Sequence, residues 1–195
     1  MESETMTRLV AQRVLYLSGF VEKEKVDRVR DQMLYLTTES STEAIKLVMD
    51  TKGGFIEPAL YLVDFIKFID TPVWGIVNGE CHSSGLVALQ GCDLRYATLN
   101  SSVHIHSVTS TFSYNSSESD SETQSRWESN KKSTQEVFVN MLNLFSVRTG
   151  MTVDDVRELC IKGDKDKVHY SARIAKEMGL IDDIWPDETS IFSSE

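Results

Sequence analysis

The stretch from Asn78 to Gly91, NGECHSSGLVALQG, joins a buried strand to a helix and decides how the rest of the chain is organised. The apolar segment 73–77 before it predicts the strand, and the small residues that begin at Ser84 predict the helix. Ser83 lies at the corner between them. A side chain at such a corner projects at the carboxyl edge of the sheet, beside helical N–H groups that stabilise negative charge, which is typical of a nucleophile. The alternative is that Ser83 only caps the helix, because Ser is a preferred N-cap and a complete G-x-S-x-G pattern is absent.

Composition limits the class of protein. The chain has 195 residues, which predicts one domain spanning 1–195, and 41% of them are hydrophobic, enough for a substantial core. A net charge of −10 and a pI near 4.9 disfavour nucleic acid or an anionic membrane as the main partner. No apolar run approaches the ~20 residues of a membrane span. Three cysteines without C-x-x-C spacing predict buried thiols in a reducing, cytoplasmic compartment.

Hydrophobic periodicity predicts strands that alternate with helices. We expect strands at 13–19, 44–49, 73–77, 93–97, 102–106 and 180–185, and helices at 22–36, 55–69, 84–90, 133–147, 152–161 and 171–179. A capping box formed by Thr152 and Asp155 marks the start of one of these helices. Alternation of this kind predicts an α/β fold with a largely parallel sheet and right-handed crossovers.

A polar segment, 107–128, interrupts this alternation and contains almost no aliphatic residues. We expect residues 110–123 to form a mobile loop. The following helix, 133–147, has an apolar stripe and a polar face, so we expect it to project from the body and to bury the stripe against a second copy of the chain. The alternative is that it folds back onto its own core. The acidic tail, 186–195, is expected to be frayed.

A double glycine provides the second stretch that bears on the chemistry. Lys52-Gly53-Gly54 follows a buried strand, and paired glycines let backbone N–H groups converge on an anion. An ordinary loop is the alternative. A phosphate-binding loop is disfavoured because the G-x-x-x-x-G-K-[ST] pattern is absent.

Histidines provide the third stretch, within residues 102–107. Strand alternation places His104 and His106 on the same face, and one imidazole can serve Ser83 as a general base. One alternative is a polar strand face with satisfied imidazoles. Another is a zinc site formed by His82, His104 and His106, for which the H-x-H spacing is a weak signal.

Six segments of the chain fall in a characteristic order: RVLYLSG (13–19), the double glycine (53–54), GECHSSG (79–85), NSSVHIH (100–106), TGMT (149–152) and MGLID (178–182). In order and spacing they resemble the family of Clp protease proteolytic subunits, over about Leu9 to Ile184. The resemblance implies the ClpP/crotonase-type α/β fold, a spiral of β-β-α units with a protruding helical handle, here 107–148. It also implies a serine endopeptidase that cleaves peptides and unfolded proteins inside a ring-shaped chamber.

The partners follow from the same resemblance. It implies a homo-oligomer of stacked heptameric rings, a peptide or unfolded protein as substrate, and a Clp-type AAA+ ATPase that feeds the chamber. We expect no cofactor and no metal, and the acidic composition argues against nucleic acid and membrane as partners. The implied location is the cytoplasm, a phage-infected host or an organelle stroma.

The resemblance also assigns the candidate site. Ser83 matches the nucleophile and His106 the general base, while Gly54 and Ser84 match the two backbone N–H donors of the oxyanion hole. The acid of the triad is expected after the helix that begins near Thr152. Counting from the two flanking motifs ends at Leu159 or at Gly163, and we assign the role to the neighbouring Asp164, with Asp166 in reserve. The alternative is that both are loop carboxylates paired with nearby lysines.

The chain also departs from the family pattern. Lys52 stands where the family has Pro, and Ser107-Val108 follows His106 in place of Gln-Pro. Lys46 and Val48 occupy positions of aromatic residues that dock the ATPase, whereas Phe68 is retained. These departures indicate a divergent, phage-encoded or plastid-like member, and they bear on ATPase coupling more than on peptide hydrolysis.

Two competing functions stay open. The first is a catalytically impaired ring subunit that only shapes or regulates an active partner, because the triad acid is not clear from the sequence. The second is a crotonase-type acyl-CoA enzyme, because the segment ALQGCDLR (88–95) is similar to the passage from helix to strand in that superfamily.

Overall fold

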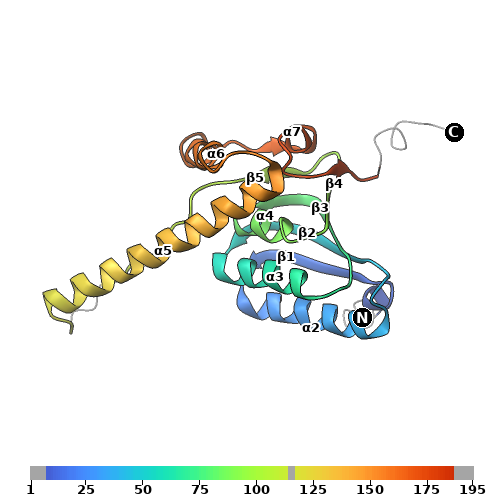
Figure 1. The fold of residues 1–195 in the computed structure, drawn as a ribbon, viewed down its shortest axis with the longest axis horizontal. Helices are drawn as coiled ribbons and strands as arrows, with labels where there is room; N and C mark the ends of the chain where they lie inside the picture. Colours follow the sequence, from blue (N-terminus) through green and yellow to red (C-terminus); the bar gives the residue numbers. More distant parts are fainter. Residues whose placement is uncertain (1–7, 114–116, 187–195) are drawn as a thin grey trace.

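The computed structural model describes residues 8–113 and 117–186 (Figure 1). In chain order, its elements are β1 (Val14–Val21), α2 (Lys23–Glu39), β2 (Ile45–Gly54), α3 (Ile56–Phe68), β3 (Val73–His82), α4 (Ser84–Leu89), β4 (Leu94–Ala97), β5 (Ser102–His104), α5 (Asp120–Thr149), α6 (Val153–Asp166), β6 (Tyr170–Ser171), α7 (Ala172–Glu177) and β7 (Asp183–Ile184). The expected α/β fold with a largely parallel sheet is confirmed.

The site lies at the point where β3 stops pairing with β4 and begins to pair with β5. Neighbouring strands in the order β1-β2-β3-β4-β7 are parallel. Residues Trp74 to Val77 of β3 pair with β4, whereas Glu80 to His82 pair with β5. β5 in turn pairs antiparallel with β6. The ends of β3 and β5 therefore lie side by side at the carboxyl edge of the sheet, which is where open α/β sheets bind their ligands.

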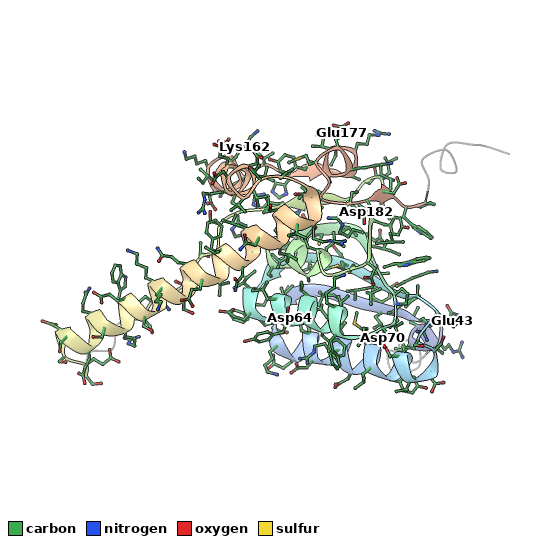
Figure 2. All side chains as sticks on the ribbon, viewed as in Figure 1. Glu43, Asp64, Asp70, Lys162, Glu177 and Asp182 are labelled. Atoms are coloured by element: carbon green, nitrogen blue, oxygen red, sulfur yellow. The ribbon has the colours of Figure 1, made fainter. Side chains whose placement is uncertain are left out.

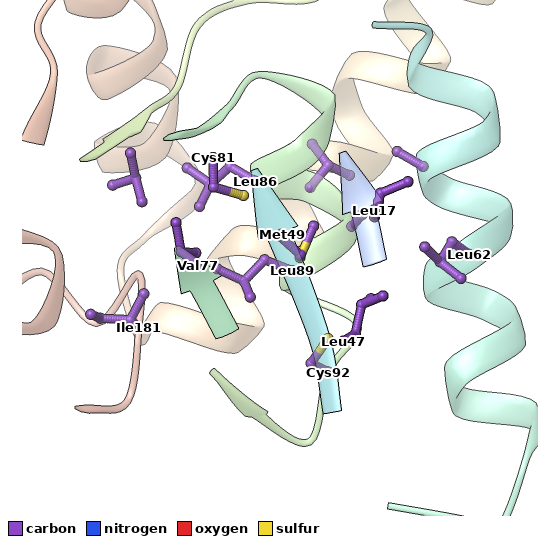
Figure 3. Packing of buried hydrophobic residues seen from close by; sticks show 14 of the residues in the cluster. Leu17, Leu47, Met49, Leu62, Val77, Cys81, Leu86, Leu89, Cys92 and Ile181 are labelled. Carbon is purple, nitrogen blue, oxygen red and sulfur yellow. The ribbon is translucent and has the colours of Figure 1, made fainter. Parts of the chain in front are cut away.

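A single hydrophobic cluster joins the sheet to the helices that cover it (Figure 3). It includes Leu17 of β1, Leu47 and Met49 of β2, Leu62 of α3, and Leu86 and Leu89 of α4. Helix α4 is buried along its whole length. The residue immediately before this helix, Ser83, is therefore held in place by the core rather than by a surface loop. The three cysteines are buried free thiols, as expected.

Helix α5 begins at Asp120, thirteen residues earlier than the expected start at 133. The prediction of a loop over 110–123 is therefore wrong for residues 120–123, which are helical. A capping box that the sequence analysis missed explains the difference: the Ser119 side chain accepts from the Glu122 N–H, and the Glu122 carboxylate accepts from the Ser119 N–H. Side-chain pairs four residues apart, such as Gln124 with Glu128, support the polar turns that follow. Residues 114–116 of the expected loop lie outside the described residues.

Helix α5 projects from the body, and only its C-terminal part packs against the core (Figure 1). Its buried residues are Met141, Leu142 and Phe145, and no residue from 120 to 136 is buried. The segment after β5 runs along part of the helix, where Ser110 donates to Asn130 and Arg126 donates to the Ser113 carbonyl, and the N-terminal turns extend beyond the body (Figure 2). The N-terminal part of α5 thus protrudes as a handle. The alternative, in which the expected helix 133–147 packs on the chain's own core, holds for its C-terminal half, because Met141, Leu142 and Phe145 belong to the core cluster.

Several other elements are also longer than expected, and three of them bear on the site. β2 continues through the double glycine to Gly54 because its pairing with β1 resumes at Phe20 and Val21. β3 continues to His82 because it pairs with β5 beyond the apolar segment. α6 continues to Asp166 instead of ending at Ile161. The expected acidic tail lies mostly outside the described residues, which end at Pro186. Within the described ranges, no helix is long and apolar enough to cross a membrane.

Candidate active site

Ser83 is held at a strained corner between β3 and α4. Its φ of 54° lies in the left-handed region, which costs a residue other than glycine on the order of 1–3 kcal/mol. Its N–H donates to the carbonyl of His104, 2.8 Å away, which ties the corner to the end of β5. Ser83 occupies the N-cap position of α4, but its side chain makes no capping hydrogen bond. The interpretation of this hydroxyl as a helix cap is therefore wrong.

The double glycine allows the end of β2 to pass directly against Ser83. A Cβ on Gly53, where φ is 95°, would lie 2.7 Å from the Cβ of Ser83. A Cβ on Gly54 would lie 2.2 Å from the carbonyl oxygen of Val21 on β1. Both separations are too short for any side chain, so only glycine fits at either position. The alternative of an ordinary loop is wrong, because both glycines belong to β2.

Two backbone N–H groups belong to residues, Gly54 and Ser84, that border the same cavity as Ser83. Phe55 donates its N–H to Val21 on β1, 2.8 Å away, and successive residues of a strand direct their N–H groups to opposite edges. The Gly54 N–H is therefore directed away from β1. Ser84 is the first residue of α4, so its N–H has no acceptor within the helix. Both groups are available to an anion in front of Ser83.

His106 follows β5 and is held by its own backbone. Its Nδ1 lies 2.7 Å from the carbonyl oxygen of Ser107. Since a carbonyl can only accept, Nδ1 carries the proton of the neutral ring and Nε2 is the unprotonated nitrogen. A general base needs this tautomer, because Nε2 is then able to receive a proton.

Asp164 lies near His106 but does not hydrogen-bond to it. The Asp164 carboxylate is 3.8 Å from His106 Nδ1 and accepts the Ser107 N–H at 3.2 Å. Asp164 and Asp166 both belong to the last turn of α6. The alternative that they are carboxylates of a loop is therefore wrong. In the described part of the chain, Asp166 forms no hydrogen bond or ion pair with His106, and neither carboxylate forms an ion pair with Lys162, Lys165 or Lys167.

Gly163, where one count from the flanking motifs ends, contacts β5 directly. A Cβ at this position would lie 1.8 Å from the carbonyl oxygen of Ile105. A carboxylate at position 163 is therefore incompatible with this backbone. The approach of α6 to β5 instead brings the next residue, Asp164, to the backbone that follows His106.

Ser83, Ser84, Gly54 and His106 line one cavity of about 300 Å³. Its apolar wall is formed by Ile56, Val87, Ile105, Val108, Val137 and Met141, and its polar rim by Ser107, Thr109, Ser110, Thr111, Asn130, Ser133 and Thr134. Helix α5 and the segment after β5 therefore contribute to the same cavity as the double glycine. No hydrogen bond joins Ser83 to His106 within the described residues, although both border this space.

A family model described as Clp protease matches residues 1–188. The chain belongs to the Clp protease family. Membership supports a peptidase, and the mostly parallel sheet agrees with the ClpP-type α/β fold.

In this Clp protease family member, the sequence analysis missed two features at or next to the site. The first is the Ser107 carbonyl that fixes the tautomer of His106, and a backbone group leaves no signal in a sequence. The second is His169, whose ring lies 4.6 Å from that of His82 and 4.9 Å from that of His104. The available signal was that His169 is the only histidine outside the segments 79–85 and 100–106.

The zinc alternative has no support in the described residues of this family member. No group of three or more His, Cys, Asp or Glu side chains within residues 8–113 and 117–186 is arranged to hold a metal ion. His82 and His104 instead make hydrogen bonds, to Ser102 and to the carbonyl of Val168.

Proposed function

We propose that this chain is a serine endopeptidase with Ser83 as nucleophile and His106 as general base. The observation that supports this most strongly is that Ser83, at its strained corner, shares one cavity with His106 and with the two donor residues, Gly54 and Ser84. Asp164 supplies the negative charge on the far side of the imidazole. We assign no role to Asp166.

In the proposed reaction, Ser83 Oγ attacks the carbonyl carbon of the scissile peptide while His106 Nε2 takes the hydroxyl proton. The N–H groups of Gly54 and Ser84 donate to the oxyanion that forms, and losing one such donor in comparable sites costs roughly 2.7–4 kcal/mol. The imidazolium then gives its proton to the departing amine. Water repeats the sequence on the acyl-enzyme and releases the second product.

The proposed substrate is a peptide or an unfolded protein. An extended chain is recognised mainly through its backbone when it adds to a strand edge, so it needs little sequence specificity. The apolar wall of the cavity accepts one side chain of such a substrate. We further propose that the enzyme works as a homo-oligomer of stacked heptameric rings, with helix α5 as the handle between rings, and that a Clp-type AAA+ ATPase delivers folded substrates.

A fluorophosphonate probe tests the proposed nucleophile. We expect it to label the chain 1–195 once, at Ser83, and to leave Ser83→Ala unlabelled. Peptide cleavage should fall by at least about 10⁴-fold in Ser83→Ala and in His106→Ala, because both act in one step. Equal labelling of Ser83→Ala would refute the assignment. Ser119→Ala, at the far end of α5, is the matched Ser control and should label normally.

A second function has a specific observation in its favour. The described structure contains no hydrogen bond between Ser83 and His106, and Asp164 contacts the Ser107 N–H in place of the imidazole. These features favour a ring subunit that shapes or regulates an active partner. Catalytic hydrogen bonds are often long before substrate arrives, however, so the peptidase remains our proposal.

Cleavage by the chain on its own separates the two functions. A homo-oligomer that hydrolyses a fluorogenic peptide, and loses this activity on His106→Ala, excludes the non-catalytic subunit. The crotonase-type alternative gives no role to Ser83 and His106, and it predicts a CoA-thioester affinity that a binding titration can measure.

A further inference from the structure

All four histidines of the chain lie together beside the proposed nucleophile, and the proposed reaction uses only one of them. We call His82, His104, His106 and His169 the histidine cluster. The distances between neighbouring ring centroids are 4.6 Å for His82–His169, 4.9 Å for His104–His169 and 5.5 Å for His104–His106.

Strand pairing assembles the histidine cluster from distant parts of the chain. The parallel register of β3 and β5 places His82 opposite His104. The antiparallel register of β5 and β6 places Val103 opposite Tyr170, and this brings the preceding residue, His169, to the other two. The cluster therefore exists only while the ends of β3, β5 and β6 remain together.

One of its hydrogen bonds requires at least one neutral imidazole. His82 Nε2 and His169 Nδ1 lie 3.3 Å apart, so one must donate and the other must accept. If both rings are protonated, both facing nitrogens are donors and this bond is lost. His82 Nε2 also lies 3.0 Å from Ser102 Oγ, and His104 Nδ1 donates to the Val168 carbonyl at 2.7 Å.

The surrounding charges do not compensate a protonated cluster. His82 faces His169, His104, Glu80 of β3 and Lys52 of β2, and Glu80 is already paired with Lys52 at 3.6 Å. His104 faces His106, His169 and the Asp164 carboxylate of α6. Only two carboxylates thus face four imidazoles, and each of those carboxylates has another partner.

Acid therefore favours separation of the three strand ends. Burial, and then the neighbouring His169, lowers the pKa of His82 from 6.5 to about 4, and burial lowers the pKa of His104 as well. A histidine ring that leaves the cluster becomes solvated, and its pKa returns to the ordinary value near 6.5. Between the two values the separated form binds more protons, so a fall in pH shifts the equilibrium toward it.

The cluster is connected to the proposed site through the backbone. His82 directly precedes Ser83, and the His104 carbonyl accepts the Ser83 N–H at 2.8 Å. We propose that the histidine cluster is an acid-sensitive latch: in the neutral form it holds β3, β5 and β6 together around Ser83 and His106, and in the protonated form it releases them. The consequence for activity, a reversible loss in acid, rests on the proposed function, whereas the latch itself does not.

Amide hydrogen exchange of the chain 1–195 between pH 7.5 and pH 4 tests the latch, after correction for the intrinsic exchange rate. In the wild type we expect the protection of residues 80–86 and 102–107 to fall at least about tenfold more than that of β1 as the pH falls. His169→Gln should move the midpoint to lower pH, because it removes the imidazole whose charge opposes protonation of His82. Glu80→Gln should move it to higher pH, because it removes a facing carboxylate. Glu24→Gln, an exposed carboxylate of α2, is the matched control and should leave the midpoint unchanged.

Two results would overturn the proposal: constant protection of these segments down to pH 4, or a midpoint that neither variant moves in its stated direction. Fluorophosphonate labelling at pH 7.5 reports on the proposed function separately. If labelling fails while the exchange midpoints move as expected, the latch stands and the peptidase assignment falls. If labelling succeeds and the midpoints do not move, the peptidase assignment stands and the latch is refuted.

Discussion

At the scale of single residues, the groups around His106 determine how much the nearest carboxylate, Asp164, can contribute to the proposed catalysis. In a hydrogen-bonded triad the acid fixes the tautomer of the base, and replacing it lowers the rate by about 10⁴. Here the Ser107 carbonyl occupies Nδ1 at 2.7 Å, and Asp164 acts from 3.8 Å and through the Ser107 N–H. In the proposed mechanism we therefore assign Asp164 the role of a positioning residue.

We predict that Asp164→Asn lowers kcat/KM for a fluorogenic peptide by only about tenfold, which is about 1.4 kcal/mol in activation free energy. The tautomer survives because its acceptor is a backbone carbonyl. Asp166→Asn, two residues away and without a hydrogen bond or ion pair to His106, is the control and should leave kcat/KM unchanged. A loss near 10⁴-fold in Asp164→Asn would show that substrate brings the carboxylate onto the imidazole.

Gly163 gives a residue-scale prediction about stability. In the interior of an exposed helix, Gly→Ala stabilises by roughly 1 kcal/mol. At position 163 the new Cβ would meet the Ile105 carbonyl at 1.8 Å, so α6 must move away from β5. We predict that Gly163→Ala destabilises by roughly 1–3 kcal/mol in urea unfolding. Lys162→Ala, exposed on the same helix, should stay within about 0.5 kcal/mol of the wild type. An increase in stability for Gly163→Ala would contradict the close packing.

At the scale of elements, the two ends of α5 are stabilised by different means. The N-terminal end relies on the capping box of Ser119 and Glu122, and no residue from 120 to 136 is buried. The C-terminal end inserts Phe145, which is fully buried, into the core. The first end depends on local hydrogen bonds and the second on hydrophobic burial.

We predict that Ser119→Ala, which removes about 1 kcal/mol of capping free energy, increases amide exchange in residues 119–125 and leaves the global unfolding free energy unchanged. Phe145→Ala should instead cost about 3–5 kcal/mol in that global quantity, because it leaves a cavity in the core. Exchange and urea unfolding, measured on both variants, separate the two effects. A global loss in Ser119→Ala would mean that the projecting part of α5 is packed in solution.

At the scale of the whole molecule, a buried arginine joins the C-terminal segment to the sheet. Arg95 of β4 has a side chain that is only 4% exposed, and it donates to both carboxylate oxygens of Asp182, at 3.2 and 2.5 Å. Asp182 lies where the C-terminal segment reaches the sheet (Figure 2). Burial alone would raise the pKa of Asp182, but the hydrogen bonds from Arg95 outweigh it and lower the pKa. The pair therefore stabilises the fold at neutral pH, and this contribution is lost in acid once the carboxylate is protonated.

We predict that Asp182→Asn destabilises the chain by about 3 kcal/mol at pH 7, because it leaves the buried guanidinium without a counter-charge. Asp183→Asn is the adjacent control. Its carboxylate pairs with Lys176 at the surface, so its loss should cost less than about 1 kcal/mol. Urea unfolding at pH 7 checks both values, and equal costs for the two variants would show that the Arg95 pair contributes no more than a surface ion pair.

Local signals in the sequence were sufficient for much of this molecule. The alternation of apolar segments predicted the parallel sheet, and the Thr152 capping box predicted the start of α6, because both patterns act within a few residues. The double glycine and Ser83 stood out because a backbone that passes this close to another chain segment tolerates only glycine. The start of α5 was missed because its capping box lies in a polar segment without hydrophobic periodicity.

By itself, the sequence determined the fold class, the Clp protease family and four residues that border the cavity, Gly54, Ser83, Ser84 and His106, since these depend on residue type and spacing. Only the tertiary structure decided that Asp164 reaches the Ser107 N–H while standing 3.8 Å from His106, and that His169 joins the other three histidines. Both facts depend on how far α6 extends and where β6 pairs with β5. Contacts of this kind join residues more than fifty positions apart, and long-range packing sets such distances where local preference does not.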